Sequence, residues 1–204
     1  MKNILFIFAF LISFSSFGQT FDESLEKAFE KSRTEDYYGT ITAYTKVIEI
    51  DPNYIAAYYN RGNAKSKLKD YYGAIADYTK VIEIDPNYID AYYNRGKAKS
   101  KLKDDYGAIA DYTKAIEIDP KYIDAYYNRG GLKQDLKDDY GAIADYTKAI
   151  EIDPNNVGAF INRGISKERL GNLNGACADW KKAERMDSNF KTILINEYLN
   201  KYCN

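Results

Sequence analysis

A fixed interval of 34 residues organises most of this sequence. An Asp-Pro pair recurs at that interval, and an Asn-Arg-Gly triplet recurs in step with it. The pairs begin at Asp51, Asp85, Asp119 and Asp153, and the triplets begin at Asn60, Asn94, Asn128 and Asn162. Residues 54–87 and 88–121 differ at only five positions. A constant period of this length is typical of stacked supersecondary units, so the chain is not expected to fold around one central core.

Each 34-residue unit carries the pattern of two helices. In residues 58–68, apolar and small side chains recur every three or four positions, as one face of a helix requires. Asp70 is placed to cap a second helix, which Asp85 and Pro86 end, because proline lacks an amide hydrogen and disfavours helix at the preceding residue. The equivalent caps are Asp36, Asp104, Asp138 and Asn172. The sequence therefore predicts an all-α chain of helical hairpins.

These units resemble the tetratricopeptide repeat (TPR) family. Counted from Phe21, Ile55, Ile89, Ile123 and Val157, four positions carry the match. Position 4 is Tyr58, Tyr92, Tyr126 and Phe160; position 8 is Gly62, Gly96, Gly130 and Gly164; position 20 is Ala74, Ala108, Ala142 and Ala176; position 24 is Tyr44, Tyr78, Tyr112, Tyr146 and Trp180. The resemblance implies a right-handed α-solenoid of five hairpins, at residues 21–54, 55–88, 89–122, 123–156 and 157–190.

Two departures from the family pattern affect the interpretation. The first unit is degenerate, with Ser24, Ala28 and Thr40 at positions 4, 8 and 20, so its first helix has the weakest support. Position 7, usually leucine in the family, is arginine in the four later units: Arg61, Arg95, Arg129 and Arg163. We expect each arginine to bury its aliphatic stem and to pair with an acidic neighbour such as Asp77. Ligand binding by these arginines is the alternative.

The carboxyl-terminal segment, residues 191–204, carries apolar side chains at helical spacing but has no partner helix of its own. A solenoid needs an end helix to cover its last apolar face, so we predict a capping helix here. Cys203 lies at its far end, and Cys177 lies near the start of the preceding helix. If the two helices are antiparallel, the two sulfur atoms lie at similar positions along the helix axes, which predicts a Cys177–Cys203 disulfide. Two free buried thiols are the alternative.

The amino-terminal residues 1–18 have the layout of a secretory signal peptide. Lys2 precedes an apolar stretch from Ile4 to Phe14, and small residues lie three and one positions before a cut after Gly18. The stretch is shorter than the ~20 residues of a membrane-spanning helix, which favours cleavage over an uncleaved anchor. We expect an exported mature chain from Gln19, periplasmic or secreted, in a bacterial cell envelope, with no stable membrane insertion.

The composition argues against a catalytic function and against nucleic-acid binding. The chain has no histidine, which removes the commonest general base and most zinc and copper sites. Its 29 Lys+Arg against 30 Asp+Glu leave no basic footprint for nucleic acid. The acidic pairs at residues 104–105 and 138–139 fall at helix starts and are interpreted as caps. We expect no catalytic residue, no metal site and no cofactor; an enzyme built on carboxylates from different units is the alternative.

The TPR resemblance implies a concave groove lined by the first helix of each unit. Positions 5 and 6 point into it and carry Tyr59, Tyr93 and Tyr127, and Asn60, Asn94, Asn128 and Asn162. A carboxamide offers donors and an acceptor to a peptide backbone, and tyrosine offers flat apolar contact. The asparagine row is similar to the ladder in the TPR region of the O-linked N-acetylglucosamine transferases. Bracing between adjacent units is an equal alternative.

The predicted function is a protein-interaction scaffold that holds an extended peptide or partner segment in this groove. One TPR subgroup binds the carboxyl-terminal tails of chaperones with lysine and arginine at set positions. Tyr59, Asp124 and Asn128 stand at those positions here, so that function is rejected. A structural module that oligomerises through its ends is the alternative. The sequence leaves the partner and the oligomeric state open.

Overall fold

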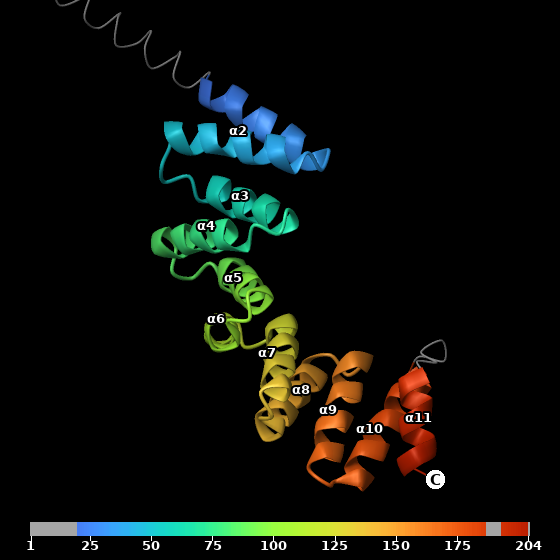
Figure 1. Ribbon diagram of the computed structural model, residues 1–204. Helices are drawn as coiled ribbons and strands as arrows, with labels where there is room; N and C mark the ends of the chain where they lie inside the picture. Colours follow the sequence, from blue (N-terminus) through green and yellow to red (C-terminus); the bar gives the residue numbers. More distant parts are fainter. Residues whose placement is uncertain (1–19, 187–192, 204) are drawn as a thin grey trace, which may run out of the picture. The chain divides into compact units, whose positions relative to one another are not determined.

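The structure, a computed structural model, describes residues 20–186 and 193–203. A first helix covers residues 20–33. The helices that follow it are α2 (Tyr37–Ile50), α3 (Ile55–Lys67), α4 (Tyr71–Ile84), α5 (Ile89–Lys101), α6 (Asp105–Ile118), α7 (Ile123–Asp135), α8 (Asp139–Ile152), α9 (Val157–Arg169), α10 (Leu173–Met186) and α11 (Ile193–Tyr202) (Figure 1). The predicted signal peptide at residues 1–18 lies outside the described residues.

The chain divides into two compact units, residues 1–103 and 104–204. The described part of the first unit holds the hairpin of helix 20–33 with α2, the hairpin of α3 with α4, and α5. The second unit holds α6, the hairpins α7–α8 and α9–α10, and α11. Within each unit, neighbouring helices along the chain pack against each other. This is the predicted fold class, an all-α solenoid of helical hairpins with a short C-terminal helix.

The second helix of each hairpin begins at a side-chain cap, as predicted. The carboxylate of Asp70 accepts a hydrogen bond from the amide of Gly73 at 3.0 Å. The equivalent bonds are made by Asp36, Asp104, Asp138 and Asn172. A cap of this kind satisfies an amide that would otherwise lack a partner. α4 then ends at Ile84, and Asp85 has the extended backbone that the following proline favours.

The turn inside each hairpin places one residue in the left-handed backbone region. In the first four hairpins this residue is Glu35, Lys69, Lys103 or Lys137, with φ between 56° and 65°, and in the fifth it is Gly171. Glycine is the usual residue there because a Cβ atom makes the left-handed conformation unfavourable. Four hairpins therefore carry a local backbone strain that the fifth does not.

The paired helices approach closely because small residues face large rings. A Cβ atom on Gly62 would lie 2.9 Å from Cε1 of Tyr78, and one on Gly164 would lie 2.7 Å from Cδ1 of Trp180. Both rings are essentially fully buried. Glycine at position 8 is thus required by contact between the two helices, as the family resemblance implies.

The degenerate first hairpin keeps this packing with different small residues. Ala28 and Thr40 take the places of the usual glycine and alanine, and both are buried. Phe21 and Leu25 pack against the same core cluster as Tyr44. The first helix, which had the weakest support in the sequence, therefore forms through its apolar contacts with α2 and α3.

α11 covers the end of the last hairpin. The ring of Tyr198 stacks on that of Trp180 with centroids 4.8 Å apart, and Leu199 packs against the cluster that contains Phe160. A disulfide joins Cys177 to Cys203, with Cα atoms 5.5 Å apart. The predicted capping helix and the predicted disulfide pairing are both present.

Candidate functional site

The seven residues predicted to contact a peptide lie on the first helices of the hairpins. Tyr59 and Asn60 are on α3, Tyr93 and Asn94 on α5, Tyr127 and Asn128 on α7, and Asn162 on α9. All seven side chains are half-buried. They thus combine fixed positions with partial exposure, as contact residues must.

In the first unit the structure joins Tyr59 to Asn94. The Nδ2 group of Asn94 donates to the hydroxyl oxygen of Tyr59 at 3.0 Å. The Tyr59 ring also contacts Tyr78 and Tyr88, with centroids 6.1 and 5.2 Å away. Burial raises the pKa of Tyr59, and the carboxylate of Asp90 raises it further, so the hydroxyl stays protonated at neutral pH.

The second unit repeats the arrangement with Tyr127 and Asn162. Nδ2 of Asn162 donates to the Tyr127 hydroxyl at 3.0 Å, and the Tyr127 ring meets the edge of Tyr146 at 5.8 Å. A Cβ atom on Gly158 would lie 3.0 Å from the Tyr127 hydroxyl oxygen. Glycine at that position of α9 therefore lets the hydroxyl reach across from α7.

These two bonds show that two of the asparagines contact a neighbouring hairpin. Asn94 and Asn162 each brace their hairpin against the preceding one, and these bonds do not test whether the same side chains also contact a ligand. Each carboxamide has two amide hydrogens and an oxygen acceptor, and the brace uses one hydrogen. Asn128 donates to the backbone oxygen of Asp124 within its own helix at 2.9 Å. Contact of any of these side chains with a ligand remains a prediction.

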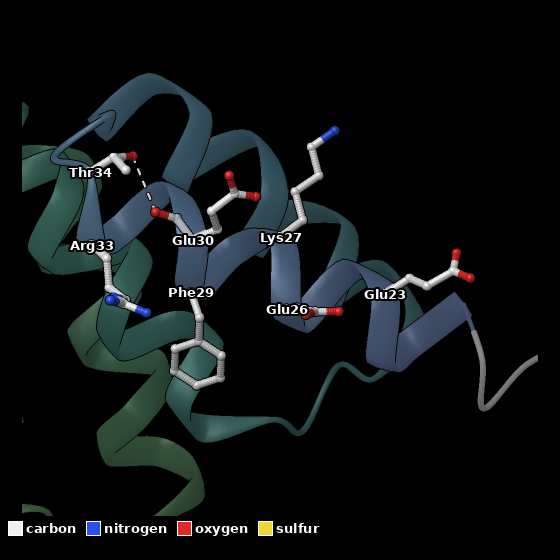
Figure 2. A pocket seen from close by; sticks show the side chains of 7 residues that line it. All are labelled: Glu23, Glu26, Lys27, Phe29, Glu30, Arg33 and Thr34. Carbon is white, nitrogen blue, oxygen red and sulfur yellow. Dashed lines mark hydrogen bonds between the residues drawn. The ribbon is translucent and has the colours of Figure 1, made fainter.

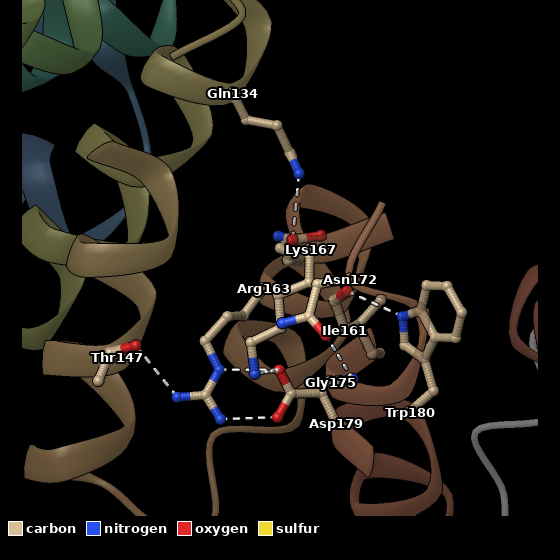
Figure 3. Close-up of polar contacts among 10 residues, drawn as sticks. Gln134, Thr147, Ile161, Arg163, Lys167, Asn172, Gly175, Asp179 and Trp180 are labelled. Atoms are coloured by element: carbon tan, nitrogen blue, oxygen red, sulfur yellow. Dashed lines mark hydrogen bonds and ion pairs between the residues drawn. The ribbon is translucent and has the colours of Figure 1, made fainter. Parts of the chain in front are cut away.

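Three of the position 7 arginines, Arg61, Arg129 and Arg163, bind acidic residues of their own hairpins. Arg163 donates through Nε and Nη2 to the two carboxylate oxygens of Asp179, at 2.8 and 2.7 Å, and through Nη1 to Thr147 of the preceding hairpin (Figure 3). Lys167 approaches the same carboxylate at 2.7 Å. Arg61 with Asp77, and Arg129 with Asp145, form the same network.

This network assigns the arginines to structure, as the sequence predicted. Asp77, Asp145 and Asp179 are buried, so each carboxylate needs the two cations that surround it. Each of the three guanidinium groups also lies over the position 4 aromatic ring, 5.3 to 5.7 Å from its centroid. A guanidinium held on three sides in this way has little freedom to bind a ligand.

Other polar contacts between hairpins gave no signal in the sequence. Gln134 of α7 donates to the hydroxyl of Ser166 at 2.9 Å and to the backbone oxygen of Asn162 (Figure 3). Asp139, the second member of an acidic pair, is buried and lies 3.5 Å from Arg169 of α9. The first member, Asp138, caps α8. Neither carboxylate is placed for acid–base chemistry, because each serves a structural contact.

A depression on helix 20–33 is lined by Glu23, Glu26, Lys27, Phe29, Glu30, Arg33 and Thr34 (Figure 2). The charged side chains extend away from one another, and Thr34 donates to the backbone oxygen of Glu30 at 3.1 Å. Phe29 is 48% exposed. Mixed charges on one helix face do not converge on a reacting group, so this depression has no catalytic geometry.

Residues 20–186 and 193–203 contain no cluster of three or more His, Cys, Asp or Glu side chains that could hold a metal ion. None of the helices in these ranges has the length and apolar character needed to cross a membrane.

The helical hairpins and the contacts between their first helices define a helical-repeat protein. A family model described as tetratricopeptide repeat matches residues 55–88, 89–122 and 123–156, another described as TPR repeat matches 35–69, and a further tetratricopeptide repeat model matches 145–178. The chain belongs to the tetratricopeptide repeat family. TPR repeats are typically non-enzymatic modules that bind proteins, so this chain is a protein-interaction scaffold with protein or peptide partners.

Solved structures of several TPR proteins are similar to this chain. A crystal structure of MamA is 27% identical, with a TM-score of 0.80, and covers 85% of this chain and 97% of its own. YrrB, described as a TPR protein with an unusual peptide-binding site, is 21% identical, with a TM-score of 0.76 and coverage of 89% and 96%. A Parabacteroides merdae TPR protein is 20% identical, with a TM-score of 0.78 and coverage of 88% and 71%. No curated protein sequence matches the chain.

Proposed function

We propose that this scaffold holds an extended peptide, or an extended segment of a partner protein, against the first helices of its hairpins. The observation that carries the proposal is the Tyr–Asn pair that recurs in both units, Tyr59 with Asn94 and Tyr127 with Asn162. The tyrosine fixes the carboxamide at 3.0 Å, and one amide hydrogen and the Oδ1 acceptor are outside that bond. A peptide bond offers one donor and one acceptor, which match these two groups.

Orientation of the carboxamide before binding favours affinity, because less side-chain freedom is lost on association. The half-buried tyrosines at 59, 93 and 127 would add apolar contact beside the peptide. Asn60 and Asn128 complete the proposed contact set. YrrB, whose description names a peptide-binding site, has the same fold.

A matched set of variants tests the proposal. The probe is a random twelve-residue peptide library displayed on phage, and the binders selected with the mature chain are synthesised for titration calorimetry. Asn94→Ala and Asn162→Ala remove the carboxamides and should each weaken binding about five- to tenfold, the effect of one or two hydrogen bonds. Tyr59→Phe and Tyr127→Phe remove only the bracing hydroxyls.

The phenylalanine variants separate a ligand contact from a purely structural brace. They should bind within about threefold of the unchanged chain, because the carboxamides remain. If no peptide is enriched, or if the alanine variants bind as tightly as the unchanged chain, the asparagines are braces only and the proposed site is wrong.

We also propose that the chain works outside the cytoplasm after removal of residues 1–18. Support comes from the amino-terminal pattern and from the Cys177–Cys203 bond, since disulfides persist mainly in oxidising compartments. The mass of the protein purified from its native cell should correspond to a chain from Gln19 with both thiols oxidised. A retained Met1 together with two free thiols would count against export.

We infer, finally, that the scaffold catalyses no reaction and uses no cofactor or metal. The support is chemical: the chain has no histidine, and the buried carboxylates of Asp77, Asp145 and Asp179 are each engaged by an arginine and a lysine. Addition of EDTA to the mature chain should therefore leave its melting temperature and peptide affinity unchanged. A loss of either on chelation would overturn this inference.

A further inference from the structure

Four exposed lysines lie at the carboxyl ends of α3 and α5. Lys67 is the last residue of α3 and Lys101 the last residue of α5, at position 13 of their repeats. Lys69 and Lys103 follow two residues later, at position 15, in the turn after each helix. We call these four side chains the lysine edge.

The ends of the two helices lie beside each other in the first unit. α3 and α5 are in contact, and Asn94 of α5 bonds to Tyr59 of α3 at nearly the same position of the repeat. The equivalent helices of the second unit show how their ends meet: Arg169, at position 13 of α9, donates to the backbone oxygen of Gln134, at position 12 of α7, at 3.1 Å. Lys101 holds the place of Arg169 in α5. The lysines of the two ends therefore belong to one surface.

The chain does not balance the charge of this surface. Within residues 20–186 and 193–203, none of the four ammonium groups forms an ion pair with a carboxylate, whereas Lys65 of the same unit lies 2.8 Å from Asp77. The nearest carboxylates in the sequence, Asp70 and Asp104, each accept from a backbone amide as helix caps. Four exposed cations thus face two carboxylates that already have partners.

This charge pattern is confined to two of the five hairpin turns. Positions 13 and 15 are Lys67 and Lys69, and Lys101 and Lys103, but they are Arg33 and Glu35 in the first repeat, Asp135 and Lys137 in the fourth, and Arg169 and Gly171 in the fifth. The first and fourth turns therefore carry opposite charges side by side. In the fifth, Arg169 lies 3.5 Å from Asp139. Positive charge gathers at the lysine edge although the whole chain has a net charge of -1.

A partner with spaced negative charges matches the lysine edge best. Ammonium groups attract carboxylates without demanding a fixed geometry, and exposed charges of opposite sign speed association. Asp70 and Asp104 directly follow Lys69 and Lys103 in the sequence. A polymer with a charge on every unit, such as nucleic acid, would place some of its charges against these carboxylates. A protein segment with acidic residues at intervals can place its charges on the lysines alone.

We propose that the lysine edge docks an acidic segment of a partner protein, in which aspartate or glutamate residues are separated by uncharged ones. The contact is made between exposed charges, so it weakens as salt is added. Lys67 and Lys101 lie about two helical turns beyond Tyr59 and Asn94. Docking at the lysine edge therefore does not depend on the proposed peptide site.

The test selects binders of the mature chain from a phage library of twelve-residue peptides. Every second residue of each peptide is aspartate or glutamate, and the other residues are random. Selected peptides are synthesised, together with versions in which each acid is replaced by its amide. The acidic peptides should bind about tenfold or more tightly than their amide versions, and their affinity should fall as sodium chloride is raised.

Two double variants remove the charges of the lysine edge. Lys67→Gln with Lys101→Gln, and Lys69→Gly with Lys103→Gly, should each weaken binding about threefold to twentyfold, the effect of two exposed ion pairs. Because Lys69 and Lys103 both have φ of 64°, the glycine variant should also raise the urea midpoint. Weaker binding by a more stable chain excludes unfolding as its cause.

Matched controls separate charge from shape. Arginine at the same four positions keeps the charge and should bind within about twofold of the unchanged chain. Lys121→Gln with Lys182→Gln removes two exposed lysines of the second unit and should leave the affinity unchanged. Asn94→Ala with Asn162→Ala should also leave it within about twofold, because these residues belong to the proposed peptide site.

Three outcomes would overturn the proposal. The lysine edge is not a docking surface if the acidic library yields no binder, or if its binders keep their affinity for both double variants. If the asparagine variants alone weaken binding, the peptides occupy the proposed peptide site, which then stands while the lysine edge fails. If an oligothymidylate of thirty nucleotides binds more tightly than the selected peptides and depends on the same lysines, the surface recognises polyanions in general and not an acidic protein segment.

Discussion

Replacing Asp145 with alanine should lower the free energy of unfolding by about 3–5 kcal/mol. The Asp145 side chain is only 4% exposed. It accepts from Nε and Nη2 of Arg129 at 2.9 and 2.6 Å, and Lys133 lies 2.8 Å away. The two cations are 14% and 21% exposed. Removal of the carboxylate leaves these two cations largely buried and without their counter-charge, which explains the large expected cost.

Urea unfolding monitored by circular dichroism at 222 nm measures the effect. With a slope of about 2 kcal/mol per molar urea, the midpoint should fall by roughly 1.5–2.5 M. The matched control is Glu151→Ala, which removes an equally short pair. Lys148 lies 2.6 Å from Glu151, but the two side chains are 56% and 55% exposed. Solvent screens such a pair, so the control should shift the urea midpoint far less than Asp145→Ala does.

Burial, not distance, thus sets the expected order of the two variants. Equal midpoints for Asp145→Ala and Glu151→Ala would refute the reasoning. A further check is the double variant Arg129→Met with Asp145→Ala, which removes one of the stranded cations. It should be more stable than Asp145→Ala alone, since an uncompensated buried charge costs more than its replacement by an apolar side chain.

Three further predictions address the backbone, the cap and the buried tyrosines. Lys69→Gly should raise the free energy of unfolding by about 1 kcal/mol by relieving left-handed strain, whereas Gly171→Ala should lower it; urea midpoints that move the other way would contradict this. Reduction of the disulfide should destabilise the mature chain by roughly 3 kcal/mol in thermal melts and change the fluorescence of Trp180, the sole tryptophan, which stacks on the cap. Burial raises the pKa of Tyr78 and Tyr146, so stability should be complete below the ordinary tyrosine pKa of about 10 and fall as pH rises above it, because the unfolded chain loses these protons first. An unchanged urea midpoint between pH 9 and pH 11 would show that this burial has no energetic effect.

The features that the sequence predicted well depend on local chemistry. An aspartate ahead of an amphipathic stretch, such as Asp70, caps a helix whatever lies beyond it, and Asp-Pro ends a helix for reasons confined to the two residues. The pairing of Arg61 with Asp77 was also predictable. An aspartate recurs in step with each position 7 arginine, at Asp77, Asp111, Asp145 and Asp179, and a guanidinium with a buried stem needs a carboxylate.

The features that the sequence did not predict depend on distances between hairpins. A carboxamide serves equally well as a brace or as a ligand contact, so composition could not decide the role of Asn94. The bond to Tyr59 follows from the spacing of α3 and α5, which the repeat period does not specify. The left-handed backbone at Lys69 was missed for a different, local reason, because lysine is not the residue that normally marks such a turn.

Amide hydrogen exchange of the mature chain, with and without a selected peptide and read by mass spectrometry, tests most directly whether the first helices form the binding face. A peptide bound as proposed should slow exchange in α3, α5, α7 or α9, with α4 and α8 little changed. Slower exchange confined to α4, α6 or α8, or to helix 20–33 and α11, would place the partner elsewhere and contradict the proposed site.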